Sequence, residues 1–317
     1  QVVALYNRTR ARAEALGEAF GIGAIYNDPE ELLASEEVDA VDIITGVDSH
    51  STFVRLATSR GLPAICQKPL APSLTEAEAM LATCRASGTR LLVHENWRWQ
   101  TPIQEIKRQL ESGVIGEPFR ARLQFSSSFP VFDNQPFLRE LEQFILTDMG
   151  SHILDVARFL FGEAQRLYCQ TGRVNSAIQG EDVATVILRQ GGVTTTCELS
   201  YASRLEHERF PETYMLIEGS RGSLELGPDY WIRCTTVEGT LARRTPPPRY
   251  AWADPAYDLV HASIVPCLAD VLRDLRDGVP AETRGEDNIN TTRLVFAAYE
   301  SARTGQAVVP NSTALEV

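Results

Sequence analysis

Three residues at two places in the sequence have side chains that exchange protons readily. Lys68 stands in the stretch ICQKPLA, directly before a proline, and Asp148 and His152 stand four residues apart in LTDMGSHILDVARF. Amine, carboxylate and imidazole groups are common general acids and bases in enzymes. Both places are therefore candidates for proton transfer to or from a bound ligand.

The backbone around Lys68 is predicted to be fixed. Residues 63–66 read as a buried strand, and the strands of a doubly wound parallel sheet end at the ligand-binding crevice. Pro69 restricts the residue before it to extended geometry, so the lysine would leave the strand end in one direction. An amine partly withdrawn from water can donate or accept a proton near neutral pH. The alternative is a surface lysine whose ammonium group reaches solvent.

The second place is predicted to be one face of a helix over residues 148–161. Asp148, His152 and Asp155 fall at positions i, i+4 and i+7, which lie on the same side of a helix. An adjacent apolar stripe would bury this helix: Ile153, Val156 and Leu160. A carboxylate near a helix N-terminus is favourable in any case. A capping aspartate beside a core histidine is therefore the alternative.

The first hundred residues alternate short apolar runs with helical patterns. Strands are predicted at residues 2–6, 41–44, 63–66 and 90–94, and helices at 9–20, 29–34, 51–59 and 75–87. This spacing is typical of βαβ units and of a Rossmann-type, doubly wound parallel sheet. Asp28 is a predicted helix N-cap, and Gly21 and Gly61 are predicted to end helices.

The pattern changes near Asn96. Strands are predicted at residues 118–126, 165–172, 182–189, 194–201, 214–218, 223–226 and 231–237, and helices at 103–112, 148–161, 255–276 and 288–304. Gln190-Gly191-Gly192 between two alternating runs predicts a hairpin. We expect an α/β protein of two domains. Residues 1–96 would bind a dinucleotide, and residues 97–317 would form an α+β domain with a mostly antiparallel open sheet, its last helix packing back on the first domain.

Length and composition exclude several classes of protein. A chain of 317 residues is long enough for two hydrophobic cores. Its net charge of −12 argues against nucleic-acid binding, and it has no apolar run long enough to span a membrane. Six scattered cysteines predict reduced thiols in a cytoplasmic protein, without a disulfide framework or a metal site.

The order of these signals resembles the Gfo/Idh/MocA oxidoreductases, the family of glucose–fructose oxidoreductase and inositol dehydrogenase. The matching segments are VDIITGVDSHSTFVRLATSRGLPAICQKPLA, LTDMGSHILDVARFLFGE and NTTRLVFAAYESARTGQAVV. The resemblance implies reversible oxidation of a secondary alcohol on a sugar, cyclitol or related polyol by a nicotinamide cofactor. It also implies a cis bond before Pro69. His152 would accept the hydroxyl proton, Lys68 would polarise the same oxygen, and Asp148 would face Lys68 across the crevice.

The printed sequence departs from the family pattern in two ways. The family opens with a strand and a Gly-x-Gly-x-x-Gly turn, whereas residue 1 lies at what reads as the second strand. We expect a preceding segment to carry them; the alternative is a chain that binds a dinucleotide poorly. Gly21-Ile22-Gly23 follows a helix, so it is predicted to be a cap and turn. Gln67 stands where the family more often has glutamate.

Two groups of residues are expected to bind the cofactor. Asn7 and Arg8 follow the strand that would meet the adenosine ribose, where a carboxylate would favour NAD and an arginine accommodates the phosphate of NADP. The absence of a carboxylate favours NADP over NAD, unless Arg8 is a solvated residue at a helix start. Thr45 and His50 would lie along the nicotinamide side, with a helix cap at Ser49 as the alternative.

Further residues complete the predicted site and its surroundings. Gln67 and Lys68 would also contact the cofactor, and Asn96 and Arg98, in the stretch NWRW, would line the substrate pocket with Lys68, Asp148 and His152. Interdomain packing is the alternative for the two tryptophans. The open face of the antiparallel sheet would meet a second subunit in a homodimer or homotetramer, through Val183, Thr185, Ile187, Val193, Thr195 and Cys197.

Three other functions fit the same pattern. The fold also hosts NAD-dependent lyases or glycosidases, which retain and recycle the cofactor. A non-catalytic ligand sensor is a second possibility, against which Lys68, Asp148 and His152 argue. A truncated, inactive relative is the third.

Overall fold

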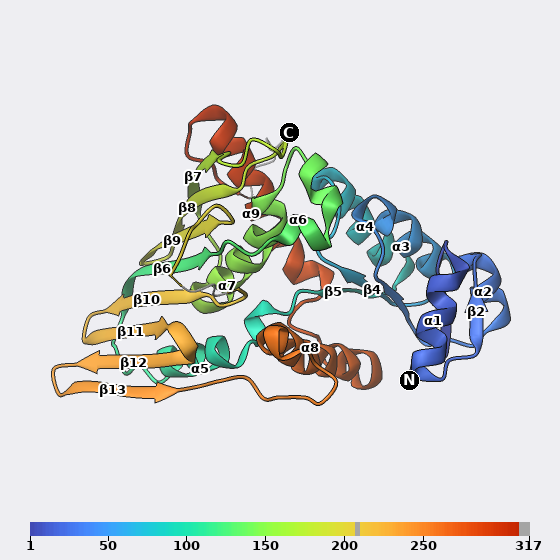
Figure 1. The fold of residues 1–317 in the computed structure, drawn as a ribbon, viewed down its shortest axis with the longest axis horizontal. Coiled ribbons are helices and arrows are strands. Elements are labelled where there is room, and N and C mark those ends of the chain that lie inside the picture. The colour runs from blue at the N-terminus through green and yellow to red at the C-terminus, as the bar shows by residue number, and fades with distance from the viewer. Residues whose placement is uncertain (207–209, 311–317) are drawn as a thin grey trace. The chain divides into compact units, whose positions relative to one another are not determined.

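The computed structural model describes residues 1–206 and 210–310, and the chain divides into two compact units between Val93 and His94. Figure 1 shows the elements of each unit along the chain. The first unit alternates strands and helices, and the second is built on one large sheet. Among the described residues, every helix is too short or too polar to cross a bilayer.

The first unit has the parallel strands and connecting helices of a Rossmann fold. Its strands are β1 (Ala4–Tyr6), β2 (Ala24–Tyr26), β3 (Val41–Ile43), β4 (Ala64–Gln67) and β5 (Leu91–His94). Its helices are α1 (Arg10–Phe20), α2 (Pro29–Ser35), α3 (His50–Ser59) and α4 (Leu74–Ser87). The pairs β1–β2 and β3–β4 are parallel, which confirms the predicted fold class. Only the short strand β2 was not predicted.

The predicted ends of the first two helices are confirmed. The Asp28 side chain accepts hydrogen bonds from the backbone N–H groups of Glu30 at 2.8 Å and Glu31 at 3.4 Å, so it satisfies donors that have no partner within α2. Gly21 ends α1 in the left-handed conformation, with φ 69°. A side chain would be strained there, and glycine avoids that cost.

Hydrogen bonds divide the first unit's strands into two groups, β1–β2 and β3–β4–β5. In the strand order of a dinucleotide-binding sheet, the first strand lies between the second and the fourth. These two positions correspond here to β1 and β3, at the inner ends of the two groups. The segment expected before residue 1 stays a prediction.

The second unit contains an eight-stranded sheet in the order β13-β12-β11-β10-β6-β9-β8-β7. The strands are β6 (Pro118–Ser126), β7 (Arg166–Gly172), β8 (Val183–Gln190), β9 (Val193–Ser200), β10 (Tyr214–Gly219), β11 (Gly222–Gly227), β12 (Trp231–Thr236) and β13 (Gly239–Arg244). Neighbouring strands of this sheet are antiparallel except the parallel pair β6–β9. The predicted hairpin between β8 and β9 is confirmed, and β13 was not predicted.

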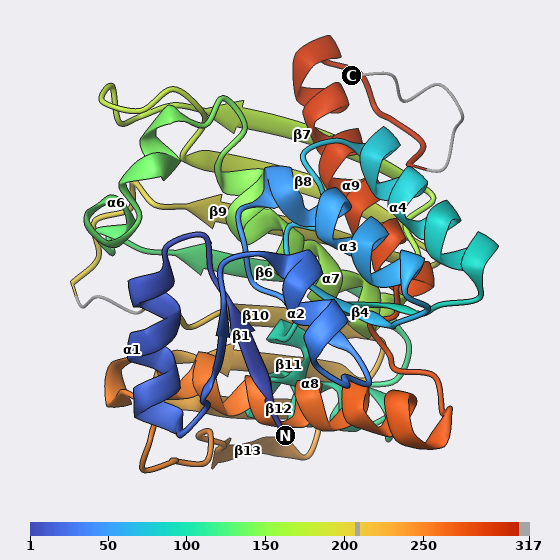
Figure 2. The ribbon, with the colours of Figure 1, turned by 90° about the vertical axis from the view of Figure 1, so that its right-hand side faces the viewer.

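Helices cover one face of this sheet. They are α5 (Thr101–Glu111), α7 (Ser151–Phe161), α8 (Asp258–Asp277) and α9 (Gly285–Thr304), and Figure 2 shows the strands behind α7, α8 and α9. α9 packs against β7 and α7, within the second unit. Its predicted packing on the first domain stays a prediction.

The predicted composition of the open sheet face is wrong for β9. Val193, Thr195 and Cys197 are buried in the core instead of lying on that face. The register explains the error: Cys197 pairs with Val186, and directly opposite residues of an antiparallel pair point to the same side. Because Val186 is buried, Cys197 is buried with it. On β8 the prediction holds, since Ile187 is exposed on the open face.

Candidate active site

Asp148 lies in a π-helical turn, Leu146–Gly150, directly before α7. The prediction of a regular helix from this residue onward is therefore wrong for its first turn. π turns inside helices occur often at functional sites, because they redirect side chains. Glu181 holds this one in place by accepting hydrogen bonds from the backbone N–H groups of Phe144 (3.2 Å) and Leu146 (3.1 Å).

The carboxylate of Asp148 is oriented by a tyrosine that sequence reasoning missed. Tyr201 directly follows β9, and its hydroxyl donates to Oδ2 of Asp148 at 3.1 Å. Burial raises the pKa of Tyr201 well above its usual value, and the Asp148 carboxylate raises it further. Tyr201 therefore stays protonated and remains a hydrogen-bond donor at every physiological pH.

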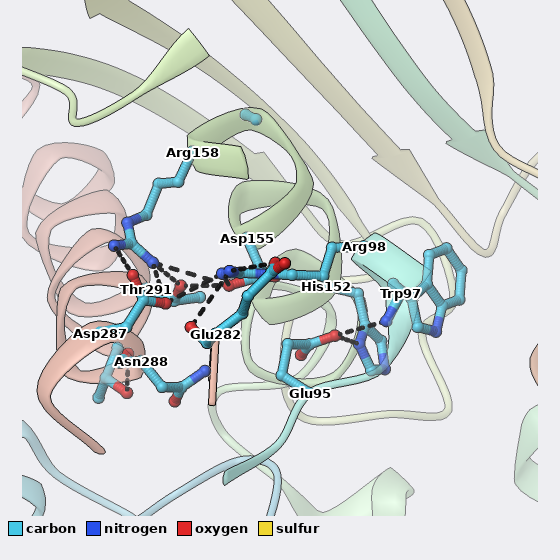
Figure 3. Close-up of polar contacts among 12 residues, drawn as sticks. Glu95, Trp97, Arg98, His152, Asp155, Arg158, Glu282, Asp287, Asn288 and Thr291 are labelled. Carbon is cyan, nitrogen blue, oxygen red and sulfur yellow. Dashed lines mark hydrogen bonds and ion pairs between the residues drawn. The ribbon is translucent and has the colours of Figure 1, made fainter. Parts of the chain in front are cut away.

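His152 lies in the first turn of α7, where it is buried against Glu95 and Trp97 (Figure 3). Its Nδ1 is 2.6 Å from Oε1 of Glu95. The indole ring of Trp97 stacks on the imidazole, with centroids 4.7 Å apart and planes inclined by 12°. No sequence signal pointed to Glu95, which lies between the strand predicted at residues 90–94 and the NWRW stretch.

A chain of aromatic contacts connects the two candidate groups within the second unit. Trp97 meets Phe125 edge to face at 6.0 Å, and Phe125 meets Tyr201 in the same way at 5.4 Å. His152 therefore stacks on one end of this chain, and Tyr201 holds Asp148 at the other. Close-packed rings in such geometry resist rotation. The imidazole of His152 and the carboxylate of Asp148 are therefore held by a rigid set of aromatic side chains.

Asp155, one turn beyond His152, belongs to a buried ion network (Figure 3). Arg98 donates to its two carboxylate oxygens from Nε at 2.8 Å and Nη2 at 2.6 Å, and the hydroxyl of Thr291 donates at 2.8 Å. Burial would raise the pKa of Asp155, but the charges of Arg98 and Arg158 and the hydrogen bonds from Arg98 and Thr291 outweigh it and hold the pKa below the usual value. Asp155 is therefore a permanent anion that fixes α7.

The predicted substrate ligands Asn96 and Arg98 are both buried and engaged with neighbours in the second unit. Arg98 binds Asp155 and also donates to Oδ2 of Asp287 at 3.0 Å. The amide nitrogen of Asn96 donates to the hydroxyl of Ser263 at 2.6 Å. These contacts favour a structural role for both residues, and their contact with substrate stays a prediction.

In the first unit, Lys68 directly follows β4, as its place before Pro69 predicts. The peptide bond between the two residues is cis, and the backbone N–H of Lys68 donates to the side-chain oxygen of Gln67 at 3.1 Å. Lys68 is half-buried. Because it belongs to the first unit, and Asp148 and His152 to the second, their convergence on one ligand stays a prediction.

His50 links two loops at the carboxyl ends of strands β3 and β4. Its Nδ1 is 3.1 Å from the carbonyl oxygen of Leu70, and its Nε2 is 3.2 Å from that of Thr45. Ser49 occupies the N-cap position of α3, as the alternative expected, but its hydroxyl donates to the Gly46 carbonyl at 2.8 Å and makes no capping bond to the helix. Cofactor contact by Thr45 and His50 stays a prediction.

Asn7 and Arg8 directly follow β1. The side-chain oxygen of Asn7 accepts a hydrogen bond from the backbone N–H of Thr9 at 2.8 Å, which forms a turn into α1. Arg8 is exposed at this strand end. Its guanidinium group is thus placed where an adenosine ribose would lie in a dinucleotide-binding fold, and its role in binding stays a prediction.

A Rossmann unit followed by an α+β unit with a buried imidazole–carboxylate pair is typical of nicotinamide-dependent oxidoreductases. Two family models match the chain: the oxidoreductase family with an NAD-binding Rossmann fold at residues 1–95, and the GFO/IDH/MocA C-terminal domain at residues 103–225. The chain belongs to the GFO/IDH/MocA family, and it is an NAD(P)-dependent dehydrogenase. The predicted resemblance is confirmed.

Similar proteins include two curated relatives and one solved structure. D-apiose dehydrogenase of Paraburkholderia graminis is 46% identical over 97% of this chain and 82% of its own length. D-apiose dehydrogenase of Rhizobium rhizogenes is 43% identical over 97% and 89% of the two lengths. The crystal structure of an oxidoreductase from Agrobacterium radiobacter in complex with NAD+, L-tartaric acid and magnesium superposes with a TM-score of 0.95 at 43% identity, covering 97% and 90% of the chains.

Proposed function

We propose that this dehydrogenase oxidises a CH–OH group of a small sugar, with D-apiose as the first candidate substrate. The observation that carries the proposal is the buried His152, paired with Glu95 on one side and stacked on Trp97. An imidazole held in this way is suited to accept one proton in a fixed direction. Two relatives that share more than 40% of their residues with this chain are named for D-apiose, which supports the choice of substrate.

Each candidate residue has a distinct role in this proposal. His152 accepts the proton of the reacting hydroxyl group, and Lys68 donates a hydrogen bond to the same oxygen. Asp148, held by Tyr201, positions the reacting hydroxyl group and the adjacent hydroxyl groups of the sugar. A bound nicotinamide cofactor would supply the hydride acceptor for the carbon. The protein thereby supplies orientation and charge.

The strand ends of the first unit carry groups that fit a dinucleotide. Ile44 follows β3 and is 71% exposed, so its side chain is available to pack against a ring. Thr45 and Gly46 continue this exposed strip, and Arg8 is exposed after β1. Cofactors of Rossmann domains lie across these strand ends. We propose that Ile44, Thr45 and Gly46 lie along the nicotinamide half and Arg8 along the adenosine half.

The choice between NAD and NADP depends on Arg8 in this proposal. An exposed guanidinium group fits the 2′-phosphate of NADP, whereas the solved relative from Agrobacterium radiobacter was crystallised with NAD+. We propose that the chain accepts both, with Arg8 admitting the phosphate. Replacement of Arg8 by alanine should lower kcat/KM for NADP by about 10-fold and leave NAD unchanged. An equal effect on both cofactors would contradict this role.

A substrate screen tests the proposed activity. Initial rates are measured from the absorbance of the reduced nicotinamide, with D-apiose, other aldoses and cyclitols, and with each cofactor in turn. We expect turnover with at least one sugar, and its loss in the His152→Gln variant. Tight cofactor binding with substrate cleavage but no net reduction would instead indicate a lyase or glycosidase.

The open face of the sheet is our proposed surface for a homodimer. Arg120 and Arg122 on β6 form ion pairs there with Glu218 on β10 and Glu198 on β9, and Ile187 is exposed on β8. A flat face of this kind can pair with its own copy about a two-fold axis. Light scattering of the native protein should give the mass of a dimer or tetramer, and Ile187→Glu should lower it.

A further inference from the structure

We propose that Glu95 is a positioning residue that fixes the tautomer of His152. Its carboxylate would accept a hydrogen bond from the protonated Nδ1 of His152. Nε2 would then be the nitrogen that takes up the hydroxyl proton. This inference deepens the proposed function and rests on the role given there to His152. It assigns a part in the reaction to a residue that lies outside the motifs quoted from the sequence.

The tautomer follows from the chemistry of the two partners. The Nδ1 atom of His152 and Oε1 of Glu95 are 2.6 Å apart, which is a short and strong hydrogen bond. A carboxylate can only accept a hydrogen bond, so the proton of a neutral imidazole must be on Nδ1. The lone pair of the ring is then on Nε2. Without the carboxylate, either nitrogen could carry the proton.

Glu95 is itself held in place by its surroundings. It is completely buried, and its Oε1 also accepts the backbone N–H of Trp97 at 3.1 Å. Its backbone carbonyl accepts a weak bond from the thiol of Cys267, with sulfur and oxygen 3.7 Å apart. The stacked ring of Trp97 prevents the imidazole from turning over. The carboxylate and the imidazole are therefore fixed relative to each other before any ligand arrives.

The environment of Glu95 also stabilises a positive charge on His152. The second carboxylate oxygen, Oε2, is buried without a hydrogen-bond partner in the described part of the chain, so few donors neutralise this carboxylate. In a low dielectric, its negative charge acts strongly on the adjacent ring when that ring accepts a proton.

Other titratable groups near the pair do not cancel this effect. Burial lowers the pKa of His94, beside Glu95, against the opposing influence of the Glu95 carboxylate, so His94 is neutral near pH 7. Asp155, further along α7, is neutralised by Arg98 and Arg158. Asp148, which precedes His152 by one turn, accepts from Tyr201, and Glu181 at the preceding π turn accepts from the backbone N–H groups of Phe144 and Leu146. Glu95 is therefore the group that makes direct contact with Nδ1.

Nuclear magnetic resonance tests the tautomer without requiring any activity. The full chain is labelled with ¹⁵N-histidine, and the ring signals of His152 are identified by their loss in His152→Gln. We expect a proton on Nδ1 in the wild type, and a mixture or the Nε2-protonated form in Glu95→Ala. In Glu95→Gln we expect the native tautomer, because the amide oxygen can accept from both His152 and Trp97. An unchanged tautomer in Glu95→Ala would overturn the proposal.

Kinetics of the same variants separate this proposal from the proposed function. Glu95→Ala should lower kcat by about 100-fold with little change in KM, since the substrate does not touch Glu95. Glu95→Gln should lose less, about 10-fold, and the acidic limb of its kcat/KM profile should move to lower pH because the imidazolium has lost its anion. Glu163→Gln, which removes another carboxylate partner of α7 at Arg158, serves as the matched control and should behave as wild type.

The possible outcomes are distinct. A changed tautomer with unchanged kcat would keep Glu95 as the positioning residue but contradict His152 as the proton acceptor. An unchanged tautomer in Glu95→Ala would contradict the positioning role, whatever the activity of that variant. If Glu95→Ala fails to fold, Glu95→Gln decides alone, because unchanged kcat and an unmoved acidic limb would overturn the proposal.

Discussion

Two fully buried carboxylates, Asp155 on α7 and Glu95 beside the first turn of that helix, differ in their partners. Both oxygens of Asp155 receive donors, from Arg98 and Thr291, in a network that Arg158 and Asp287 extend. Glu95 receives both of its donors on a single oxygen, and one of them is an imidazole that can change its charge. In the network of Asp155 the charges of all partners are fixed, and their interactions stabilise the fold. The pairing of Glu95 leaves a carboxylate that can respond to a proton.

This difference shows how to separate a structural from a reactive buried acid. Burial alone does not distinguish them, because neither carboxylate is exposed. A carboxylate whose oxygens are bound by guanidinium groups remains charged and does not take part in proton transfer. A carboxylate paired with histidine changes the proton affinity of its partner. Substitutions in the two clusters should therefore affect different measurements.

The largest effect is expected at His152. Replacement by glutamine keeps much of the side-chain volume but removes the proton acceptor, so kcat should fall about 1,000-fold. The free energy of unfolding, measured by urea denaturation, should change much less than it does for substitutions at Asp155. A variant that is folded and retains wild-type kcat would remove His152 from the mechanism.

The next effect is expected at Asp155, on stability. Asp155→Asn would leave Arg98 and Arg158 without their buried anion, and breaking a buried pair in this way costs about 3 kcal/mol of unfolding free energy. The kcat of the protein that remains folded should stay within a few-fold of wild type. Asp155→Asn should therefore affect stability more than activity, whereas His152→Gln should affect activity more than stability. Glu163→Gln is the control, because it removes a half-exposed partner of Arg158. Equal destabilisation by both variants would contradict the comparison.

A related effect concerns acid stability. The pKa of Asp155 is lowered in the folded protein, so its contribution to stability is present above the pKa of the unfolded carboxyl group, about 4, and is lost as the pH falls through the lowered folded value. The unfolding free energy of the wild type should therefore fall below about pH 4. In Asp155→Asn this part of the decrease should be missing, which paired denaturation curves at several pH values would reveal.

The smallest of these effects is expected at Tyr201. Tyr201→Phe removes the hydroxyl group that donates to Asp148 and retains the ring that packs on Phe125 and Phe144. We expect kcat to fall about 10-fold, from one lost hydrogen bond to a charged group, with stability nearly unchanged. Tyr168→Phe is a suitable control on β7, because that tyrosine lies outside the aromatic chain. Equal losses in both variants would contradict the orienting role of Tyr201.

Much of the architecture could be predicted from the sequence because local patterns carry it. The alternation of strands and helices, the Asp28 cap and the Gly21 terminus all depend on neighbouring residues. The strand at residues 193–200, VTTTCELS, was assigned to the wrong face because threonines occupy both faces, so the phase of its alternation cannot be read from hydrophobicity. Only its register with β8 determines which side is buried.

The site could be predicted only where its residues share one element. Asp148 and His152 are four residues apart, so their proximity follows from a helix. Glu95 is 57 residues from His152, and Tyr201 is 53 residues from Asp148. Tertiary packing brings these pairs together, and no local pattern encodes it. The π turn at Leu146–Gly150 was missed for the same reason, since the distant Glu181 holds its backbone.

A crystal structure of the complex with a nicotinamide cofactor and a bound sugar would test most directly whether His152 and Lys68 act on the same hydroxyl group. We expect Nε2 of His152 and Nζ of Lys68 both to lie within hydrogen-bond distance of the reacting hydroxyl oxygen, with Nδ1 of His152 still bound to Glu95. A sugar bound away from His152, or an imidazole with Nε2 pointing away from the hydroxyl group, would contradict this expectation.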